Sequence, residues 1–361
     1  MNRFLVGMAC VAGVGAAQAA TYRVVDLGIA EGFVSSFAYG LSDNNFVAGW
    51  MQDAAGGTQA FRWSAAEGLT VLALRDGATA SRGFGVNSAG QVVGETAYAG
   101  EREATLWAAG NAQGLGTLNG AGSSVAFAIN DAGQVTGWSD AQPDTRAFLW
   151  SAGGGMQNLG VVDGGSQSRA YAINNDGTVA GWGRTAAGDR GFTGDAGGLQ
   201  GVGTAGADAT SRTRAFGISS NGWVTGDASD PALGSEAFLW SSGTGVMALG
   251  KLAGSTASFG AGVNADGVAV GWTESAAGDV AFLWSSGGGM QSLDGLLQDS
   301  GGWQIQRARS INDAGYIVGN ALSADGQLRA VMLVPVPEPA SWAMLGAGAL
   351  LVFGAATRRR D

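Results

Sequence analysis

The stretch Ala126 to Trp138, AFAINDAGQVTGW, recurs in near copies along the whole chain. Aligned on the Asn or Ser that begins the turn, the copies number seven and follow one another at intervals of 43 to 48 residues. The aligned positions are Ser42, Asn87, Asn130, Asn174, Ser219, Asn264 and Asn312. Such a period is typical of proteins built from one supersecondary unit, so the length of 361 residues reflects unit size times copy number.

Each copy has the pattern of a β-hairpin. An apolar run such as AFAI comes first, then N/S-x-x-G or a close variant, then a second run of the form x-V/I-x-G. Asn or Ser at the first turn position and Gly at the fourth suit a type I turn followed by a residue with positive φ. Six of the seven copies have this Gly, and the exception is Asn45 in the first copy.

Two further strands are predicted after each hairpin. The third is marked by sequences such as AFRW at Ala60 to Trp63 and AFLW at Ala147 to Trp150. The fourth follows a Gly-rich turn and ends in Leu and usually Gly, as in MQNLG at Met156 to Gly160. Four short strands in about 45 residues are the strand count and the period of a β-propeller blade.

The two ends of the repeat region indicate a closed ring. The last copy ends at RAVMLV, Arg329 to Val334, without a fourth strand, and YRVVDLG at Tyr22 to Gly28 has no hairpin before it. A first strand that completes the last blade removes open sheet edges, which promote aggregation. We therefore predict an all-β, seven-bladed β-propeller over residues 21–334, closed by its N-terminal strand.

Residues 1–20 have the features of a secretory signal peptide: one early charge at Arg3, an apolar run, and the small-residue exit Ala17-Gln18-Ala19. The only cysteine, Cys10, lies in this segment, so we expect no disulfide in the exported chain. Histidine is absent, which excludes Ser-His-Asp and Cys-His catalysis and His-based zinc sites. The net charge of −10 argues against nucleic acid and anionic lipid as partners.

Residues 335–361 contain three features in order. A Pro-rich stretch, PVPEPASW, leads into an apolar run, and the run ends in three arginines. The 18 residues from Ala340 to Thr357 would just span a bilayer core as a helix at about 1.5 Å per residue. The arginines would then lie on the cytoplasmic side of a transmembrane helix.

This tail resembles the PEP-CTERM sorting signal. The residues that carry the resemblance are Val336, Pro337, Glu338, Pro339, Arg358, Arg359 and Arg360. The resemblance implies that an exosortase in the inner membrane of a Gram-negative bacterium recognises and processes the tail. The protein would be anchored transiently through its C-terminal helix and then reach the cell surface or an exopolysaccharide matrix. The alternative interpretation of the tail is an ordinary stop-transfer anchor.

The repeat itself resembles the HAF family of extracellular repeats. In that family an AINxxGxVVG hairpin is followed by HAFLW and by a GMxxLG strand. This chain keeps the Ala-Phe part, but Gln59, Arg146, Glu236 and Val280 stand where the family has His. The resemblance covers about residues 21–334 and implies the propeller architecture, and it assigns no reaction.

Tryptophans recur at two positions of the repeat, near the ends of the predicted second and third strands. The two sets are Trp50, Trp138, Trp182 and Trp272, and Trp63, Trp107, Trp150, Trp240 and Trp284. Rings at repeated positions could stack on sugars, but we expect them to pack between blades, where a large ring buries much area and its N–H finds an acceptor.

Two sets of acidic residues are candidates for metal binding and for glycoside hydrolysis. Asp131, Asp176, Asp266 and Asp313 lie in the turns and offer oxygens to calcium, but their density is low for a calcium loop, so we interpret them as turn formers. Asp43, Glu95, Asp227 and Glu274 are the pool for a catalytic carboxylate pair, which must flank one bond at roughly 5 to 9.5 Å. Sequence spacing cannot show such a pair, and these four acids do not cluster in the sequence.

We therefore expect a non-enzymatic, exported repeat protein with no catalytic residue, cofactor or metal site. It would act as a structural or binding module of the cell envelope or exopolysaccharide matrix, with exosortase as processing partner and polysaccharide or surface proteins as possible ligands. A loop-lined mouth at the centre of the ring is the expected ligand site. A lectin-like propeller and a propeller glycoside hydrolase or lyase are the alternatives.

Overall fold

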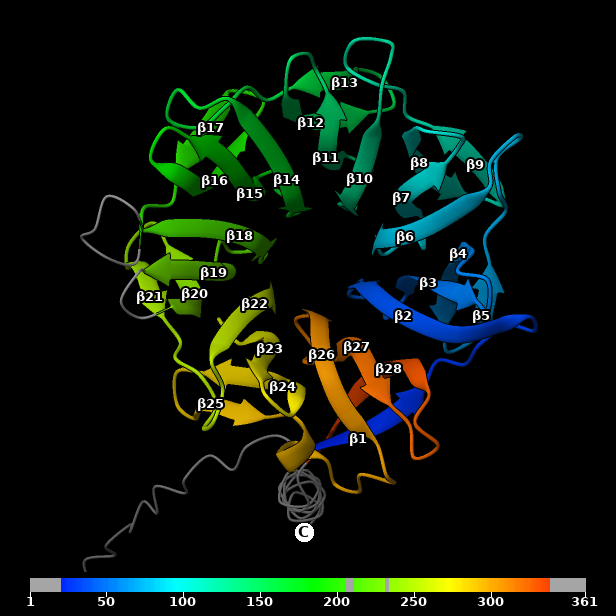
Figure 1. Cartoon of the computed structure of the whole chain (residues 1–361), viewed down its shortest axis with the longest axis vertical. Helices are drawn as coiled ribbons and strands as arrows, with labels where there is room; N and C mark the ends of the chain where they lie inside the picture. The colour runs from blue at the N-terminus through cyan, green and yellow to red at the C-terminus, as the bar shows by residue number, and fades with distance from the viewer. Residues whose placement is uncertain (1–20, 205–210, 231–233, 338–361) are drawn as a thin grey trace, which may run out of the picture.

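A computed structural model describes residues 21–204, 211–230 and 234–337. It contains seven four-stranded antiparallel sheets arranged as blades around a central axis (Figure 1). The predicted seven-bladed propeller is confirmed. The predicted signal peptide and C-terminal helix lie outside the described residues. Within the described residues, no helix is long and apolar enough to cross a membrane.

The first six blades each take four consecutive strands. Blade 1 has β2 (Phe33–Leu41), β3 (Val47–Asp53), β4 (Thr58–Ser64) and β5 (Gly68–Val71), and blade 2 has β6 (Ala80–Val86), β7 (Val92–Ala97), β8 (Arg102–Ala108) and β9 (Asn111–Gly114). Blade 3 has β10 (Ser124–Ile129), β11 (Val135–Asp140), β12 (Thr145–Ser151) and β13 (Gly155–Asn158), and blade 4 has β14 (Gln167–Ile173), β15 (Val179–Thr185), β16 (Gly188–Asp195) and β17 (Gly198–Gly201). Blade 5 has β18 (Arg212–Ile218), β19 (Val224–Asp230), β20 (Gly234–Ser241) and β21 (Gly245–Ala248), and blade 6 has β22 (Ala257–Val263), β23 (Ala269–Ser275), β24 (Gly278–Ser285) and β25 (Gly289–Ser292).

The seventh blade is built from both ends of the described chain. After a short 3-10 helix, Asp294–Leu296, it takes β26 (Gln304–Ile311), β27 (Ile317–Leu322), β28 (Leu328–Val336) and, as its outermost strand, β1 (Thr21–Asp26). Strand β1 pairs antiparallel with β28, with Thr21 opposite Val336 and Asp26 opposite Val331. The N-terminal strand thus completes the last blade, as predicted, and β28 continues two residues beyond Val334.

The hairpin turns follow the predicted chemistry. All six Gly at the fourth turn position have positive φ, between 72° and 86°, and Asn45 takes the same conformation with φ of 60°. Asn tolerates this left-handed region better than other residues with a Cβ. Asn45 is therefore a substitute that preserves the turn, and the first copy is a hairpin like the others.

All seven inner strands carry a β-bulge at the same place, and β2 and β26 each have a second register shift nearer their start. In blade 3 the register shifts between Ala126 and Ala128, so Phe127 has no partner on β11. The same shift occurs in the other six blades. A bulge turns the extra side chain away from the regular alternation of the strand. Each blade therefore presents one bulged residue three positions before its turn.

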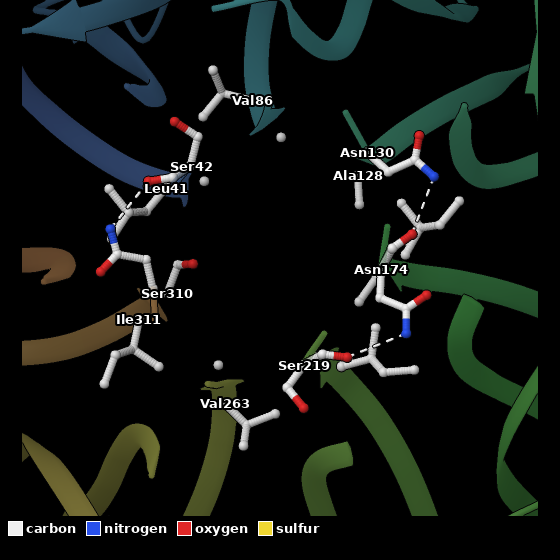
Figure 2. Close-up of a pocket in the computed structure, with 18 of the residues that line it drawn as sticks. Leu41, Ser42, Val86, Ala128, Asn130, Asn174, Ser219, Val263, Ser310 and Ile311 are labelled. Atoms are coloured by element: carbon white, nitrogen blue, oxygen red, sulfur yellow. Dashed lines mark hydrogen bonds between the residues drawn. The ribbon is translucent and has the colours of Figure 1, made fainter. Parts of the chain in front are cut away.

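Asparagine side chains join each turn to the next one around the axis. Asn130 Nδ2 donates to the carbonyl of Asn174 at 3.1 Å, and Asn174 Nδ2 donates to the carbonyl of Ser219 at 3.2 Å (Figure 2). Where the turn begins with Ser, an Asn two residues later makes the link: Asn44 donates to Ser88 and Asn221 to Ala265. Three more links, from Asn87, Asn264 and Asn312, complete seven links around the ring.

Because either an Asn at the first turn position or a Ser followed by Asn two residues later makes the link between turns, one arrangement should be able to replace the other. Asn130→Ser should lower the free energy of unfolding by about 1 kcal/mol, because the Asn174 carbonyl loses one of its two donors and keeps only the Gly177 N–H. Adding Ala132→Asn, two residues after the turn begins, recreates the Ser-x-Asn arrangement of Ser42 with Asn44 and should restore about half of the loss. Urea unfolding of both variants and of Ala132→Asn alone tests this. A double variant no more stable than Asn130→Ser contradicts it.

Side chains of the third strands fill much of the space between neighbouring blades. The Phe of the Ala-Phe signature is fully buried in blades 1, 3, 5 and 6, and Phe192 occupies the same place in blade 4. The third-strand tryptophans pack in these cores as predicted: Trp107 and Trp150 are 4% and 7% exposed, and Trp107 Nε1 donates to the carbonyl of Ala73 at 2.9 Å.

Buried hydroxyl groups also join neighbouring blades. Ser124 Oγ on β10 accepts the N–H of Ala104 in blade 2 at 2.9 Å and donates to the carbonyl of Gly116 at 2.7 Å. The same N–H to hydroxyl bond recurs at Ser36, Ser81, Ser168, Thr213 and Ser258. Each hydroxyl satisfies a buried backbone donor that the sheets leave unpaired at the blade boundary.

Candidate functional site

The inner strands enclose a cavity of about 410 Å³ at the axis of the ring. Residues from all seven blades line this central cavity, and Figure 2 shows Leu41, Val86 and Ile311 around its edge. The cavity thus lies at the centre of the ring, where the sequence predicts the ligand site.

Five aromatic side chains form a belt in the wall of the central cavity. This aromatic belt consists of Tyr39, Phe84, Phe127, Tyr171 and Phe216. Neighbouring rings are in contact, with centroids 5.3, 5.3, 4.6 and 5.2 Å apart in that order. Each belongs to the bulge of its inner strand, so the bulges place these rings at the cavity. The belt residues are half-buried and do not belong to the hydrophobic clusters between the blades.

The belt is interrupted at blades 6 and 7. The bulged residue of blade 6 is Ala261, and that of blade 7 is Arg309. The Arg309 guanidinium lies 4.7 Å from the ring centroid of Tyr39 and 4.9 Å from that of Trp272, which also lines the cavity. Burial lowers the pKa of Arg309 from its usual range. The Nε atom of Arg309 and the Nε1 atom of Trp272 are buried without a hydrogen-bond partner among the described residues.

A second set of arginines lies two residues before the bulge, farther from the turns. This arginine layer consists of Arg82, Arg169, Arg214 and Arg307. Their guanidinium groups stack on second-strand tryptophans: Arg82 on Trp50 at 5.0 Å, Arg169 on Trp138 at 4.9 Å, Arg214 on Trp182 at 5.1 Å and Arg307 on Trp272 at 5.0 Å. Three of these four arginines also pair with carboxylates: Arg82 with Glu95, Arg214 with Asp189 and Arg307 with Asp279.

The second-strand tryptophans differ from the sequence prediction in two ways. Each is the fourth residue of its strand, and β3 continues from Trp50 to Asp53. They are half-buried and stack on Phe or Arg, as Trp50 does on Phe37 with centroids 3.9 Å apart. The prediction that the indole N–H finds an acceptor is wrong for Trp50 and Trp272, whose Nε1 atoms have none.

The turn end of the central cavity is acidic. Asp43, Asp131 and Asp313 follow the first turn residue of their blades and line the cavity. Burial raises the pKa of Asp43, and the Asp313 and Asp131 carboxylates raise it further. The Asp131 carboxylate accepts the N–H of Ser88 at 2.8 Å, and the Asp313 carboxylate accepts that of Ala265 at 2.8 Å.

The turn acids therefore hold neighbouring turns together, which agrees with their interpretation as structural residues. Asp176 and Asp266 lie one position later in their turns than Asp131 and Asp313. Among the described residues, no group of three or more acidic side chains is arranged to hold a metal ion.

The four acids considered for glycoside hydrolysis lie in four different blades. Glu95 and Asp227 occupy the same place, the fourth residue of the second strand, in blades 2 and 5. Glu95 lies 3.4 Å from both Arg82 and Arg102. Glu274 is near the end of β23, and Asp43 is in a turn. The structure thus does not pair these acids with one another in one blade.

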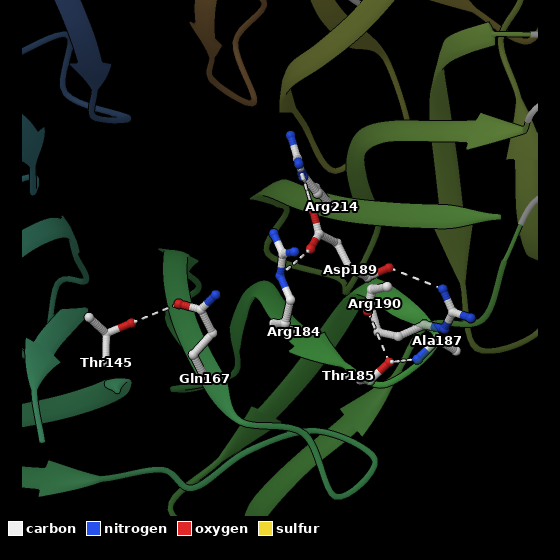
Figure 3. Close-up of polar contacts among 9 residues, drawn as sticks. Thr145, Gln167, Arg184, Thr185, Ala187, Asp189, Arg190 and Arg214 are labelled. Atoms are coloured by element: carbon white, nitrogen blue, oxygen red, sulfur yellow. Dashed lines mark hydrogen bonds and ion pairs between the residues drawn. The ribbon is translucent and has the colours of Figure 1, made fainter. Parts of the chain in front are cut away.

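Asp227 instead has Asp189 as its acidic neighbour, a residue that the sequence did not single out. Burial raises the pKa of Asp227 to about 6, against the opposing effect of Arg214, and the Asp189 charge adds to the increase. Asp189 is 1% exposed and lies between Arg184 at 3.1 Å and Arg214 at 2.5 Å (Figure 3). Sequence spacing does not indicate that Asp189 and Asp227 lie near each other, because the two acids belong to blades 4 and 5.

A family model for the PEP-CTERM protein-sorting motif matches residues 335–360. This motif is generally a signal for processing by exosortase, and it implies export and sorting to the cell surface or the extracellular space. Its first two residues, Pro335 and Val336, pair with Tyr22 and Thr21 in blade 7. Among curated proteins, none matches the sequence.

Several solved propellers are similar to this chain. A puromycin hydrolase mutant complexed with PGG has a TM-score of 0.55 and 13% identity, covering 82% of this chain and 53% of the hydrolase. A catalytically inactive virginiamycin B lyase from Staphylococcus aureus with quinupristin has a TM-score of 0.52 and 11% identity, covering 87% of this chain and 100% of the lyase. At such identities the similarity shows the fold alone, and the chain is a surface-sorted protein with a propeller fold.

Proposed function

We propose that this protein is a non-enzymatic binding module of the cell surface or extracellular matrix, and that it binds exopolysaccharide in its central cavity. The observation that carries the proposal is the aromatic belt. Five large rings line a cavity that solvent reaches, although they belong to none of the interblade cores. Exposed apolar surface gathered in one concave place is typical of a binding site.

The chemistry of the belt favours sugar as the ligand. A pyranose ring has an apolar face of C–H groups and a rim of hydroxyls, and an aromatic ring is a flat apolar surface of matching size. Polar groups line the same cavity, among them the exposed Asp43 carboxylate and the half-buried Ser310 hydroxyl. The sorting signal directs the protein to the compartment where extracellular polysaccharide is found.

An enzymatic function has one observation in its favour, the pKa of Asp227 near 6, which suits a general acid. The Asp189 and Asp227 carboxylates are poorly placed to reach a substrate, because the two residues are 1% and 8% exposed. Turnover of a polysaccharide panel that disappears in Asp227→Asn would establish the enzymatic alternative in place of our proposal.

The belt can be tested by binding. We expect the full-length protein to bind exopolysaccharide from its producing organism saturably in calorimetry, and Phe84→Ala with Phe127→Ala to weaken binding at least about tenfold, as loss of central aromatic contacts does. Tyr98→Ala is the matched control, because Tyr98 follows β7 outside the cavity lining. Urea unfolding of both variants shows whether the ring is intact. If the folded Phe84→Ala, Phe127→Ala variant binds the polysaccharide as tightly as the wild type, the ligand does not bind at the aromatic belt.

A further inference from the structure

We propose that Arg309 is the anion-binding group of the central cavity, and that it binds the carboxylate of an acidic sugar, a uronic acid residue of the polysaccharide. The inference rests on the proposed function and specifies its ligand. It is carried by the lack of an ion pair or hydrogen bond at the Arg309 guanidinium, by its position where the aromatic belt is interrupted, and by the carboxylates at the turn end of the cavity.

Arg309 differs from the arginine layer in having neither an ion pair nor a hydrogen bond among the described residues, whereas Arg169, which has no ion pair, donates to Thr145 Oγ1 at 3.4 Å. Arg82 pairs with Glu95 at 3.4 Å, Arg214 pairs with Asp189, and Arg307 pairs with Asp279. Among the described residues, the structure gives Arg309 ring contacts with Tyr39 and Trp272 but no ion pair or hydrogen bond. Its charge is therefore held between two aromatic faces with no carboxylate in ion-pair contact, and the nearby Asp279 carboxylate pairs with Arg307 instead.

Such an arrangement is unfavourable for the free protein. A buried cation loses hydration, and cation–π contacts recover only part of that loss. The fold does not require a cation here, since the other six blades have Tyr, Phe or Ala at the bulge. A bound carboxylate would supply the missing counter-ion, with the planar, bidentate geometry that guanidinium favours.

The wall beside Arg309 leaves room for a ligand. Ala261, the bulged residue of the preceding blade, has no large side chain, whereas Phe216 and Tyr39 on either side of this gap carry rings. A uronic acid can thus place its carboxylate on Arg309 and its apolar face against the belt. The aromatic belt would then bind the apolar face of the sugar, and Arg309 would favour an acidic sugar over a neutral one.

Charge along the cavity gives the ligand an orientation. The arginine layer lies two residues farther from the turns than Arg309, and Asp313 lies four residues closer to the turn end. Asp43 and Asp131 add to the negative charge at that end. Arg309 is the arginine that lines the cavity, so an anionic sugar is expected to bind there and to be repelled by the carboxylates at the turn end.

The test compares an acid with its neutral ester. The full-length protein is titrated with tetramers of galacturonate, glucuronate and mannuronate, and with the methyl ester of each. We expect one acid at least to bind about 10-fold more tightly than its ester, as a charge-assisted hydrogen bond to a carboxylate should give. Arg309→Gln should abolish the preference and Arg309→Lys should keep part of it. Arg23→Gln, on the outermost strand of blade 7, should leave it unchanged.

Folding gives an independent readout. If Arg309 is kept for a ligand, the urea midpoint of Arg309→Gln should not fall, because the variant removes an unpaired charge. Equal binding of every acid and ester, no binding of any acid, or loss of preference in Arg23→Gln would overturn the inference. If wild type binds acid and ester equally but loses both in the belt variant, the charge selectivity fails and the proposed function survives. If the organism's own exopolysaccharide does not bind, the proposed function fails as well.

Discussion

Gly137→Ala is expected to lower the free energy of unfolding by about 3 kcal/mol or more, because overpacking against backbone cannot be relieved by a side-chain rotation. Gly137 is the Gly of the V/I-x-G run on β11. A Cβ built there lies 1.9 Å from the Val125 carbonyl oxygen and 2.9 Å from its carbon. The strands β10 and β11 would have to separate, and with them the bulge that places Phe127 at the cavity.

The same constraint holds in every blade. A Cβ would lie 1.8 to 2.2 Å from a backbone oxygen of the inner strand at Gly49, Gly94, Gly181, Gly226, Gly271 and Gly319. Urea unfolding of Gly137→Ala measures the effect, and Gly153→Ala is the control, since a Cβ at Gly153 meets nothing within 4 Å. The control should change stability by less than about 0.5 kcal/mol. Equal stability of the two variants would show that the close strand approach in blade 3 is not required.

Asp227→Asn is expected to stabilise the propeller by up to about 3 kcal/mol at pH 8 and to have no effect near pH 3. Burial raises the pKa of Asp227 in the folded protein from 3.8 to about 6. A raised carboxyl pKa favours folding when the group is protonated, so its contribution is complete below pH 4. It is lost as the pH rises through about 6, and Asn mimics the protonated form throughout.

Glu95→Gln is the matched control, because Glu95 has the same position in blade 2 but lies between two arginines at 3.4 Å. Removing its charge should destabilise the propeller at pH 7, since Arg82 and Arg102 lose their shared partner. Chemical unfolding of both variants from pH 3 to pH 8 gives the comparison. A gain in Asp227→Asn that is the same at both ends of this range would show that ionisation of Asp227 is not its cause.

Much of the fold follows from local chemistry that a sequence displays. Turn residues with a required φ, such as Gly133 and Asn45, identify each hairpin, and the absent fourth strand after Arg329 identifies the closing strand at Tyr22. The Phe of the Ala-Phe signature is buried because the third strand is enclosed by its neighbours. These features can be predicted from the residues of a single repeat or from the number of repeats. Their prediction does not require knowing which residues of neighbouring blades are in contact.

The candidate site was harder to predict, because it depends on the bulge and on contacts between blades. An apolar run such as AFAI does not show that its second residue, Phe127, forms a β-bulge and lines the central cavity. Two signals were nevertheless present in the sequence. The run ARSI in the last copy places Arg309 where five of the other six copies have Phe or Tyr, and Ser42 and Ser219 each have Asn two residues later. The pair Asp189 and Asp227 had no such signal.

The position of bound glycan is the most direct test of a polysaccharide-binding central cavity. Crystals of the protein grown with fragments of its organism's exopolysaccharide should show sugar density inside the ring, against the rings of Phe84 and Phe127. The account predicts that an acidic fragment places a carboxylate within about 3 Å of Arg309, the distance of a charge-assisted hydrogen bond. Glycan on the outer strands, with the central cavity holding only water, would contradict it.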